Sequence, residues 1–346
     1  MILLKPEVFS TFDNTPEGLH RALQHAIELE HSTIPPYLYA LYSLDPVRNA
    51  TIYSLILSIV LEEMLHMSLA CNILNAIGGK PVIDKPKFIP PYPGPLPGSV
   101  QQGLIVGLSA FTKEVVKCTF MVIEEPEDPL NFPVRNVAML GATPSYTIGQ
   151  FYDRIKAEIV KISKHRNIFT GDRRRQLTVG FADLIAVTDV DSAVQAINLI
   201  VEQGEGTTTS PLDPQDDPAH YYRFAEIYYG KKLIRNLNPR PGEPEFVYGG
   251  DPIPFDPKGV TPLVTNPKAS HYPAGSQAAD TNNNFNFTYT SMLKSLHHVF
   301  NGQPDRIAPA VQLMESMKLQ VRYLTTIEVS KGLYAGPSFQ YRPVND

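Results

Sequence analysis

Hydrophobic positions recur with a helical period along most of the chain and predict a helical bundle. Apolar residues lie three or four positions apart through residues 50–78, which predicts one long amphipathic helix. The same spacing predicts the other helices, with bounds of about 15–44, 146–165 and 191–235 in the core and about 281–300 and 304–328 in a C-terminal extension of residues 236–346. The predicted fold class is therefore all-α.

Capping and turn residues mark where these helices begin and end. Thr15-Pro16 supplies an N-cap and a proline at the first helical position, and the run from Thr147 to Gln150 is a capping box. Gly78-Gly79 ends the second helix. Pro35-Pro36 lies inside the first helix, so we expect a kink or an interruption there.

The chain has 32 prolines, and many of them lie between the helices. Residues 80–145 are rich in proline and glycine, which predicts a long crossover lying over the bundle, with Lys117–Ile123 as a strand or an extended segment. We expect residues 1–346 to form a single domain. A proline-rich linker between two domains is the alternative.

Glu63 and His66 interrupt the apolar stripe of the 50–78 helix. Positions i and i+3 share a helix face, so both side chains point toward whatever the helix packs against. A buried glutamate is costly unless it is paired or bound to a cation. Glu-x-x-His on a bundle helix is the metal-binding pattern of di-iron and di-manganese carboxylate proteins. A glutamate–histidine hydrogen bond without a metal is the alternative.

Glu30 supplies a second acid on a core stripe, seven residues after Leu23. The short turn at Asp45-Pro46 makes the first two long helices antiparallel neighbours, so Glu30 and Glu63 can meet at mid-height. Two core glutamates side by side require a cation or a shared proton.

The second half of the chain also has acids on inward helix faces and an acid-x-x-His spacing, in a less regular pattern. Glu158 continues the inward face of the 146–165 helix, and Glu205 lies four positions after Val201 on the next stripe. Asp217 and His220 repeat the acid-x-x-His spacing, and a short connection should bring Glu205 and His220 to the same end of an antiparallel helix pair. The candidate metal ligands are Glu30, Glu63, His66, Glu158, Glu205 and His220, with Glu202 and Asp217 in reserve. Carboxylate and imidazole ligands suit iron or manganese and leave zinc open.

Charge and composition narrow the function classes. A net charge of −5 and the absence of a basic run argue against a nucleic-acid partner. The sequence shows no signal peptide and no apolar run of membrane-spanning length, and its two cysteines, Cys71 and Cys118, are expected to be core thiols. These features predict a cytoplasmic protein. No phosphate loop, nucleophile elbow or CxxC motif is present.

Several motifs together resemble a known family. ELEHSTIPPYLYALYSL, EEMLH, EQGEGT, HYYRF and GPSFQY look like the ferritin-like domain of the iminophenyl-pyruvate dimer synthase family, from about residue 15 to the C-terminus. Those enzymes couple two oxidised aromatic amino-acid units in violacein- and rebeccamycin-type pathways. The resemblance implies a ferritin-like four-helix bundle with an iron-type site. The ligands that it implies are Glu30, Glu63, His66, Glu205 and His220, holding up to two irons per chain.

Two functions follow from these observations. The first is a metal-dependent, di-iron-type oxidase or oxygenase of a small amino-acid-derived or aromatic metabolite, in secondary-metabolite biosynthesis. The second is a non-catalytic ferritin-like metal-binding or partner protein. A small-molecule substrate is the expected partner, with no nucleic acid and no membrane. The sequence assigns no catalytic residue and leaves a homo-oligomer open.

Overall fold

The computed structural model describes residues 4–98, 104–126, 147–207, 210–240 and 243–343. Its helices are α1 (Pro6–Phe9), α2 (Pro16–Tyr42), α3 (Ala50–Ala76), α4 (Lys113–Val115), α5 (Met121–Ile123), α6 (Ile148–Ser163), α7 (Val190–Glu205), α8 (His220–Tyr229), α9 (Gln277–Phe300) and α10 (Ile307–Leu324). Its strands are β1 (Lys231–Arg235), β2 (Phe246–Pro252), β3 (Glu328–Ser330) and β4 (Leu333–Tyr334). The all-α fold class predicted from the sequence is confirmed.

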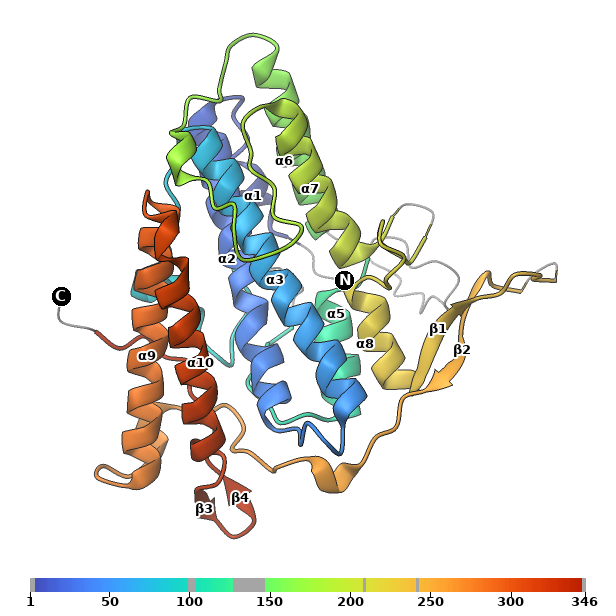
Figure 1. Cartoon of the computed structure of the whole chain (residues 1–346), viewed down its shortest axis with the longest axis vertical. Coiled ribbons are helices and arrows are strands. Elements are labelled where there is room, and N and C mark those ends of the chain that lie inside the picture. The colour runs from blue at the N-terminus through green and yellow to red at the C-terminus, as the bar shows by residue number, and fades with distance from the viewer. Residues whose placement is uncertain (1–3, 99–103, 127–146, 208–209, 241–242, 344–346) are drawn as a thin grey trace.

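Helices α2 and α3 run side by side through the molecule and form the frame of the bundle (Figure 1). At one end they pack against α6 and α7. At the other end α3 packs against α8, which also contacts the helical segment 113–123. The change from one set of partners to the other falls at mid-height, and this is where the polar core residues gather.

The helix boundaries follow the local signals in the sequence. Thr15 caps α2 by accepting a hydrogen bond from the backbone N–H of Gly18, and the predicted capping box of Thr147 and Gln150 is present at the start of α6. Helix α3 ends at Ala76, just before Gly78 with its positive φ of 83°. These three boundaries agree with the sequence prediction.

Helix α2 continues through Pro35-Pro36 without interruption. A proline at position 36 cannot donate to the carbonyl of Ser32, four residues earlier. The hydroxyl of Tyr92 donates to that carbonyl instead, at 2.7 Å, from the segment that follows α3. A side chain from the crossover therefore replaces the missing backbone hydrogen bond.

We expect Tyr92→Phe to lower the free energy of unfolding by about 1–3 kcal/mol, because it leaves the buried Ser32 carbonyl without a donor. Chemical denaturation of the variant would measure the change. The same substitution in a Pro36→Ala background should cost much less, since the alanine restores the backbone N–H. Equal costs in both backgrounds would contradict this role for Tyr92.

Two predictions of secondary structure are wrong. Residues 117–123, expected to be extended, continue a helical segment that contains a π-helical turn at Val116–Phe120. The helix predicted through residue 235 ends at Tyr229, because Gly230 adopts a left-handed conformation, and β1 then pairs with β2 in an antiparallel hairpin. Figure 1 shows this hairpin projecting from the bundle.

The relation of α7 to α8 also differs from the prediction. Instead of reversing direction to form an antiparallel pair, α8 follows below α7 in Figure 1. The loop between the two helices is closed by the short pairing of Leu212 with Pro218. His220 consequently lies in the first turn of a helix that starts at the middle of the bundle.

Contrary to the expectation from the sequence, α3 is long and apolar enough, by length and composition, to cross a membrane. The tested stretch is 61% buried inside the protein, as expected for the central helix of a bundle. Of the two cysteines, Cys71 is buried as predicted, whereas Cys118 is exposed and its thiol donates a hydrogen bond to Glu114.

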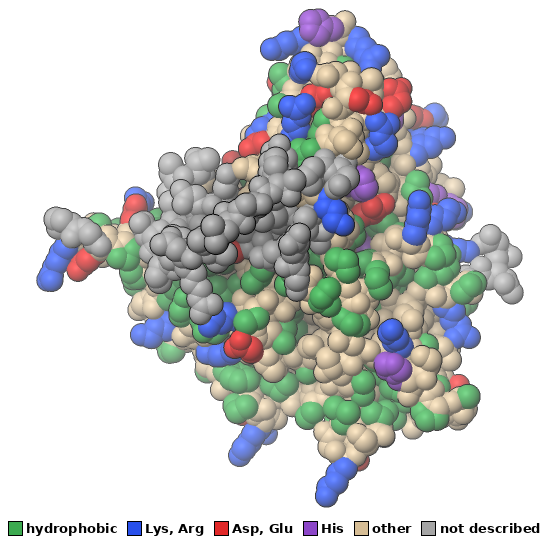
Figure 2. Space-filling model, turned by 180° about the vertical axis from the view of Figure 1, so that it is seen from behind, with side chains coloured by type: hydrophobic (Ala, Val, Ile, Leu, Met, Phe, Trp, Pro, Cys, Tyr) green, Lys and Arg blue, Asp and Glu red, His purple; other side chains and the backbone are tan. Residues whose placement is uncertain are grey.

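The surface carries charges of both signs. Figure 2 shows Lys and Arg side chains interspersed with Asp and Glu at the narrow end of the molecule. Figure 1 places the connection between α6 and α7 at this end.

Candidate metal centre

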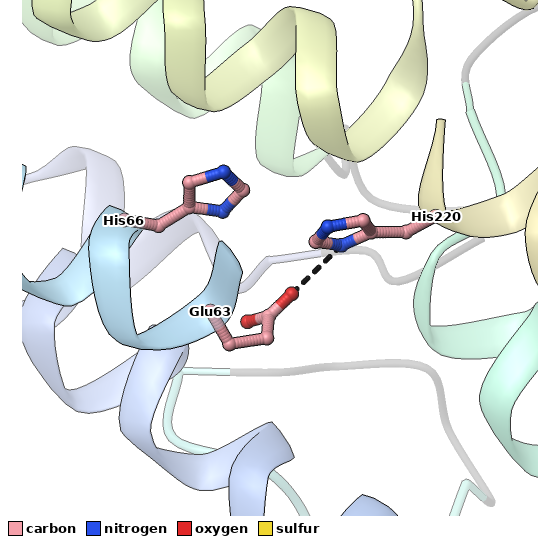
Figure 3. Close-up of side chains that lie close together, drawn as sticks. All are labelled: Glu63, His66 and His220. Carbon is pink, nitrogen blue, oxygen red and sulfur yellow. Dashed lines mark ion pairs between the residues drawn. The ribbon is translucent and has the colours of Figure 1, made fainter. Parts of the chain in front are cut away.

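Glu63, His66 and His220 converge at the middle of the bundle (Figure 3). Glu63 and His66 come from adjacent turns of α3, and His220 comes from the first turn of α8. All three are buried, and their potential ligand atoms lie within 4.8 Å of one another. This grouping of two imidazoles and a carboxylate is a candidate site for a divalent cation.

Two further carboxylates border the same group. Glu30 of α2 places Oε2 3.6 Å from Nδ1 of His66. Glu124, which follows α5, places Oε2 3.5 Å from Nδ1 of His220. Glu63 lies between them, with Oε1 2.8 Å from the same His220 nitrogen. Three acids therefore face two histidine nitrogens in a buried site.

A hydroxyl holds one oxygen of each of these three carboxylates. Tyr152 donates to Oε1 of Glu30, Tyr37 donates to Oε1 of Glu124, and Thr33 donates to Oε2 of Glu63 at 2.8 Å. The remaining oxygen of each carboxylate is the one that faces a histidine Nδ1. The hydroxyls thus fix the carboxylates while leaving one oxygen of each directed at the shared space.

The two histidines are held through their other ring nitrogen. Nε2 of His66 lies 3.0 Å from Oε1 of Gln203, and Nε2 of His220 lies 3.0 Å from Oε2 of Glu62. Each Nε2–H can donate to its oxygen, which leaves the Nδ1 lone pair for a ligand. Metal-binding histidines in proteins have this arrangement, in which an acceptor fixes the ring that binds the metal.

His220 gives a direct test of whether a cation suits this site. Its Nδ1 is buried and, among the described residues, makes no hydrogen bond, although Oε1 of Glu63 lies 2.8 Å away. A proton on Nδ1 or a shared metal cation would satisfy both of these atoms. The donor set therefore fits a hard or borderline metal ion such as iron, manganese or zinc.

The electrostatics of the site follow from the crowding of buried acids. Burial raises the pKa of Glu63, and the negative charge of Glu124 raises it further. Burial alone would lower the pKa values of His66 and His220, but the facing carboxylates outweigh it and raise both. Binding of a divalent cation would release these protons, because its ligands must be deprotonated.

Glu62 was not singled out from the sequence, yet it anchors α8 to α3. Its carboxylate accepts hydrogen bonds from both terminal nitrogens of Arg223 as well as from His220. Burial would raise the pKa of Glu62, but the hydrogen bonds and charges of His220 and Arg223 together lower it to about 2. Glu62 is therefore an ionised acceptor that orients His220.

Four of the six predicted ligands, Glu30, Glu63, His66 and His220, lie together in the structure. Glu205 borders the adjoining cavity, which has a volume of about 40 Å³, and accepts a hydrogen bond from the backbone N–H of Gly149 at 2.8 Å. A cavity of this size has room for two or three water-sized groups.

Glu158 departs from the prediction. It is buried on the core face of α6, as the periodicity indicates, but it is not among the described residues that border the cavity. Its Oε2 lies 3.7 Å from Arg154, one turn earlier on the same helix. The hydrophobic pattern identified the correct face, but position along the helix separates Glu158 from the other acids.

The reserve residues lie elsewhere. Glu202 lines a separate surface pocket with Gln195 and Asn198. Asp217 is exposed and precedes the first residue of α8, so the acid-x-x-His spacing does not fall on one helix face. Glu124, which the sequence did not single out, lies beside His220 instead.

Gly149 provides a sharp test of how closely α6 and α7 approach. A Cβ at this position would lie 2.6 Å from Oε2 of Glu205. We expect Gly149→Ala to lower the free energy of unfolding by at most about 1 kcal/mol, as measured by chemical denaturation, because the flexible Glu205 side chain can move aside at the loss of its hydrogen bond to the Gly149 N–H.

Gly204 is the matched control, since a Cβ there meets nothing within 4 Å in helix α7. Gly204→Ala should raise the free energy of unfolding by about 0.5–1 kcal/mol. Stabilisation by both substitutions would show that Glu205 does not require the close approach at Gly149.

Comparison with known proteins places this site in a wider group. A curated relative, dichlorochromopyrrolate synthase from Lentzea aerocolonigenes, is 23% identical over 391 residues, which cover 94% of this chain and 36% of the relative. The chain thus spans little more than a third of that protein. A crystal structure of a ferritin-like protein from Caulobacter vibrioides is similar with a TM-score of 0.59 and 26% identity, covering 94% of this chain and 97% of that one.

The sequence profile of the Ferritin-like family matches residues 23–229. This range extends from α2 to the end of α8 and includes every residue of the candidate metal centre described above. The chain therefore belongs to the Ferritin-like family.

Proposed function

We propose that this protein is a metal-dependent oxidase or oxygenase of a small aromatic or amino-acid-derived metabolite. The observation that carries the proposal is that the two oxygens of each of three carboxylates face different groups. Glu30, Glu63 and Glu124 each give one oxygen to a hydroxyl donor and direct the other at a histidine nitrogen. Such a donor set is costly to bury unless it serves a cation.

Five side chains would hold the iron. Glu63, His66 and His220 form the central group, and Glu30 and Glu124 face its two histidines. This arrangement resembles the carboxylate and histidine set of di-iron bundles, with Glu124 as the acid that Asp217 cannot supply. Iron bound here would supply activation of molecular oxygen.

The surrounding residues have supporting roles. Tyr37, Tyr152 and Thr33 hold protons on their hydroxyls and orient the carboxylates. Burial and the neighbouring acids raise the pKa values of both tyrosines well above the usual range, so they are donors at neutral pH. Gln203 and Glu62 orient the two imidazoles. Exclusion of bulk water by the bundle core strengthens each of these contacts.

The proposed substrate class rests on the relatives. The matched protein is a dichlorochromopyrrolate synthase, and the sequence motifs resemble the iminophenyl-pyruvate dimer synthase family. Both support an aromatic, amino-acid-derived substrate and a role in secondary-metabolite biosynthesis. Because the chain covers 36% of the curated relative, we propose the substrate class and not the relative's whole reaction.

The test has two stages. Protein is produced with iron, manganese and zinc available, and its metal content and its absorption spectrum under air are measured. Oxygen consumption is then followed with a panel of aromatic α-keto and α-imino acids, using wild type and Glu63→Ala. We expect about two irons per chain, and substrate-dependent oxygen uptake that is lost in the variant.

Two outcomes would overturn the proposal. A folded wild-type protein that retains no metal would remove the metal centre and leave a buried glutamate–histidine network. Metal retention without oxygen uptake for any member of the panel would favour the alternative, a non-catalytic metal-binding or partner protein. Circular dichroism of Glu63→Ala would establish that lost activity does not reflect unfolding.

A further inference from the structure

A second cavity, of about 320 Å³, lies on the other side of α3 from the candidate metal centre. Most of its described lining comes from α2 and α3 on one side and from α9 and α10 on the other, and Gly180, Phe181 and Phe339 complete it. Figure 1 shows the α9–α10 pair standing beside the α2–α3 pair. The cavity shares no described lining residue with the cavity beside the metal centre.

The size and lining of this cavity are those of a ligand site. Small-molecule sites in proteins occupy roughly 300–1,000 Å³ and are mainly apolar, whereas packed cores contain few voids larger than a water molecule. Five of the eight methionines in the chain line the cavity: Met64, Met67, Met292, Met314 and Met317. Methionine adapts its shape to a guest and makes favourable contacts with aromatic rings.

The cavity has an apolar entrance and no net charge. Leu61 and Val311 line it and are both exposed, at 48% and 45%. Glu315 and Lys318 are the charged side chains among its described lining residues, and they lie 3.8 Å apart as an ion pair. A lining of this kind favours an uncharged guest, because a charged guest would be desolvated without a partner.

His31 gives the cavity a polar anchor. The side chain is 3% exposed, and its Nδ1 is buried without a hydrogen-bond partner among the described residues. Its Nε2 lies 2.8 Å from the hydroxyl of Tyr289, and its ring lies 4.4 Å from that of Phe88. Burial lowers the pKa of His31 to about 3, so the ring is neutral.

The hydrogen bond to Tyr289 decides what Nδ1 offers. If the tyrosine hydroxyl donates to Nε2, both of those groups are satisfied and the single proton of the ring resides on Nδ1. The opposite arrangement would leave the hydroxyl proton as well as Nδ1 without a partner. The first arrangement is therefore favoured, and it leaves the Nδ1 proton without an acceptor among the described residues.

We propose that this cavity is a binding site for an uncharged aromatic molecule of about two rings. An engineered cavity of about 150 Å³ holds one benzene, and this cavity is about twice as large. A carbonyl or hydroxyl oxygen of the guest accepts a hydrogen bond from Nδ1 of His31. The rings contact the methionine side chains that line the cavity.

Binding of a matched pair of fluorescent probes tests this assignment. The first probe is 6-propionyl-2-(dimethylamino)naphthalene, a neutral naphthyl ketone. The second is 2-(dimethylamino)-6-propylnaphthalene, which lacks the carbonyl oxygen. We expect saturable binding of the ketone at one site per chain. His31→Phe should weaken ketone binding about tenfold, as expected for one buried hydrogen bond, and leave the propyl compound unchanged.

Two tryptophan substitutions on α10 separate this cavity from other apolar surface. Met314→Trp fills the cavity and should weaken binding of both probes at least tenfold. Leu319→Trp places the same side chain at a 64% exposed position on the same helix that does not line the cavity, and should leave binding unchanged. Circular dichroism and metal content of each variant would report on folding and on the metal centre.

Crystals soaked with a bromine-substituted naphthyl ketone provide a readout that does not depend on any variant. An anomalous bromine peak between α3 and α10 would support the assignment. It would be overturned by a lack of saturable binding to wild type, by equal binding to the two tryptophan variants, or by bromine located elsewhere. Because the two cavities share no described lining residue, each of these results is separate from any failure of the proposed oxidase function.

Discussion

Replacing His220 with alanine should leave the folded protein unable to retain metal. This residue brings the only imidazole from the second half of the bundle to the described site, and its Nδ1 faces both Glu63 and Glu124. We expect the metal content after dialysis to fall to background, because His220 is one of the three closely spaced ligands and its loss leaves Glu63 and His66 without the facing imidazole. Elemental analysis by mass spectrometry would measure it.

The control for this experiment is His165→Ala. His165 is exposed beyond the end of α6, so its loss should leave the metal content unchanged. Removal of His220 also leaves Glu62 with Arg223 but without the imidazole, which makes a fold check by circular dichroism necessary. Full metal retention in folded His220→Ala would contradict the ligand assignment.

Replacing Glu124 with glutamine should weaken metal retention far more than the same change at Glu158. The side chains of Glu124 and Glu158 are 9% and 2% exposed, but Glu124 borders the metal centre whereas Glu158 is paired with Arg154. We expect Glu124→Gln to reduce the metal content to about half or to weaken affinity by roughly 10–100-fold. Glu158→Gln should match the wild type, as judged by competition with a chelator.

The two glutamine variants also decide whether the metal ligand is Glu158, as the sequence predicts, or Glu124, as the structure indicates. Loss of metal in Glu158→Gln, with full retention in Glu124→Gln, would restore the ligand that the sequence predicted. Because glutamine preserves the volume of the side chain, packing changes contribute little to either result.

The first half of the site could be predicted because its signals are local. Glu63 and His66 share one helix face by spacing alone, and a short turn brings Glu30 alongside them. Hydrophobic periodicity also placed Glu158 on a buried face, and that part is correct. Periodicity gives the direction of a side chain but not its position along the bundle axis. Glu158 points inward, but its position along α6 keeps it away from the metal centre.

Glu124 could not be selected because its helix was missed. Val116, Phe120 and Ile123 have the i, i+4, i+7 spacing of a buried helical stripe, and all three are buried in the structure. The surrounding proline-rich sequence hid this short signal within a segment interpreted as a crossover. The sequence cannot reveal that residues 113–123 pack against α8. This packing places Glu124, the next residue, at the site.

Alternate use of neighbouring residues on α3 has a consequence for how this gene can vary. Glu63 and His66 face the metal centre, whereas Met64 and Met67, each one position later, line the second cavity. A one-codon insertion just after Glu63 would rotate every later side chain by about 100° and turn His66 away from the metal centre, toward the second cavity. Related sequences can therefore differ by substitution in this turn of α3, but we expect no insertion or deletion between the positions of Glu63 and Met67.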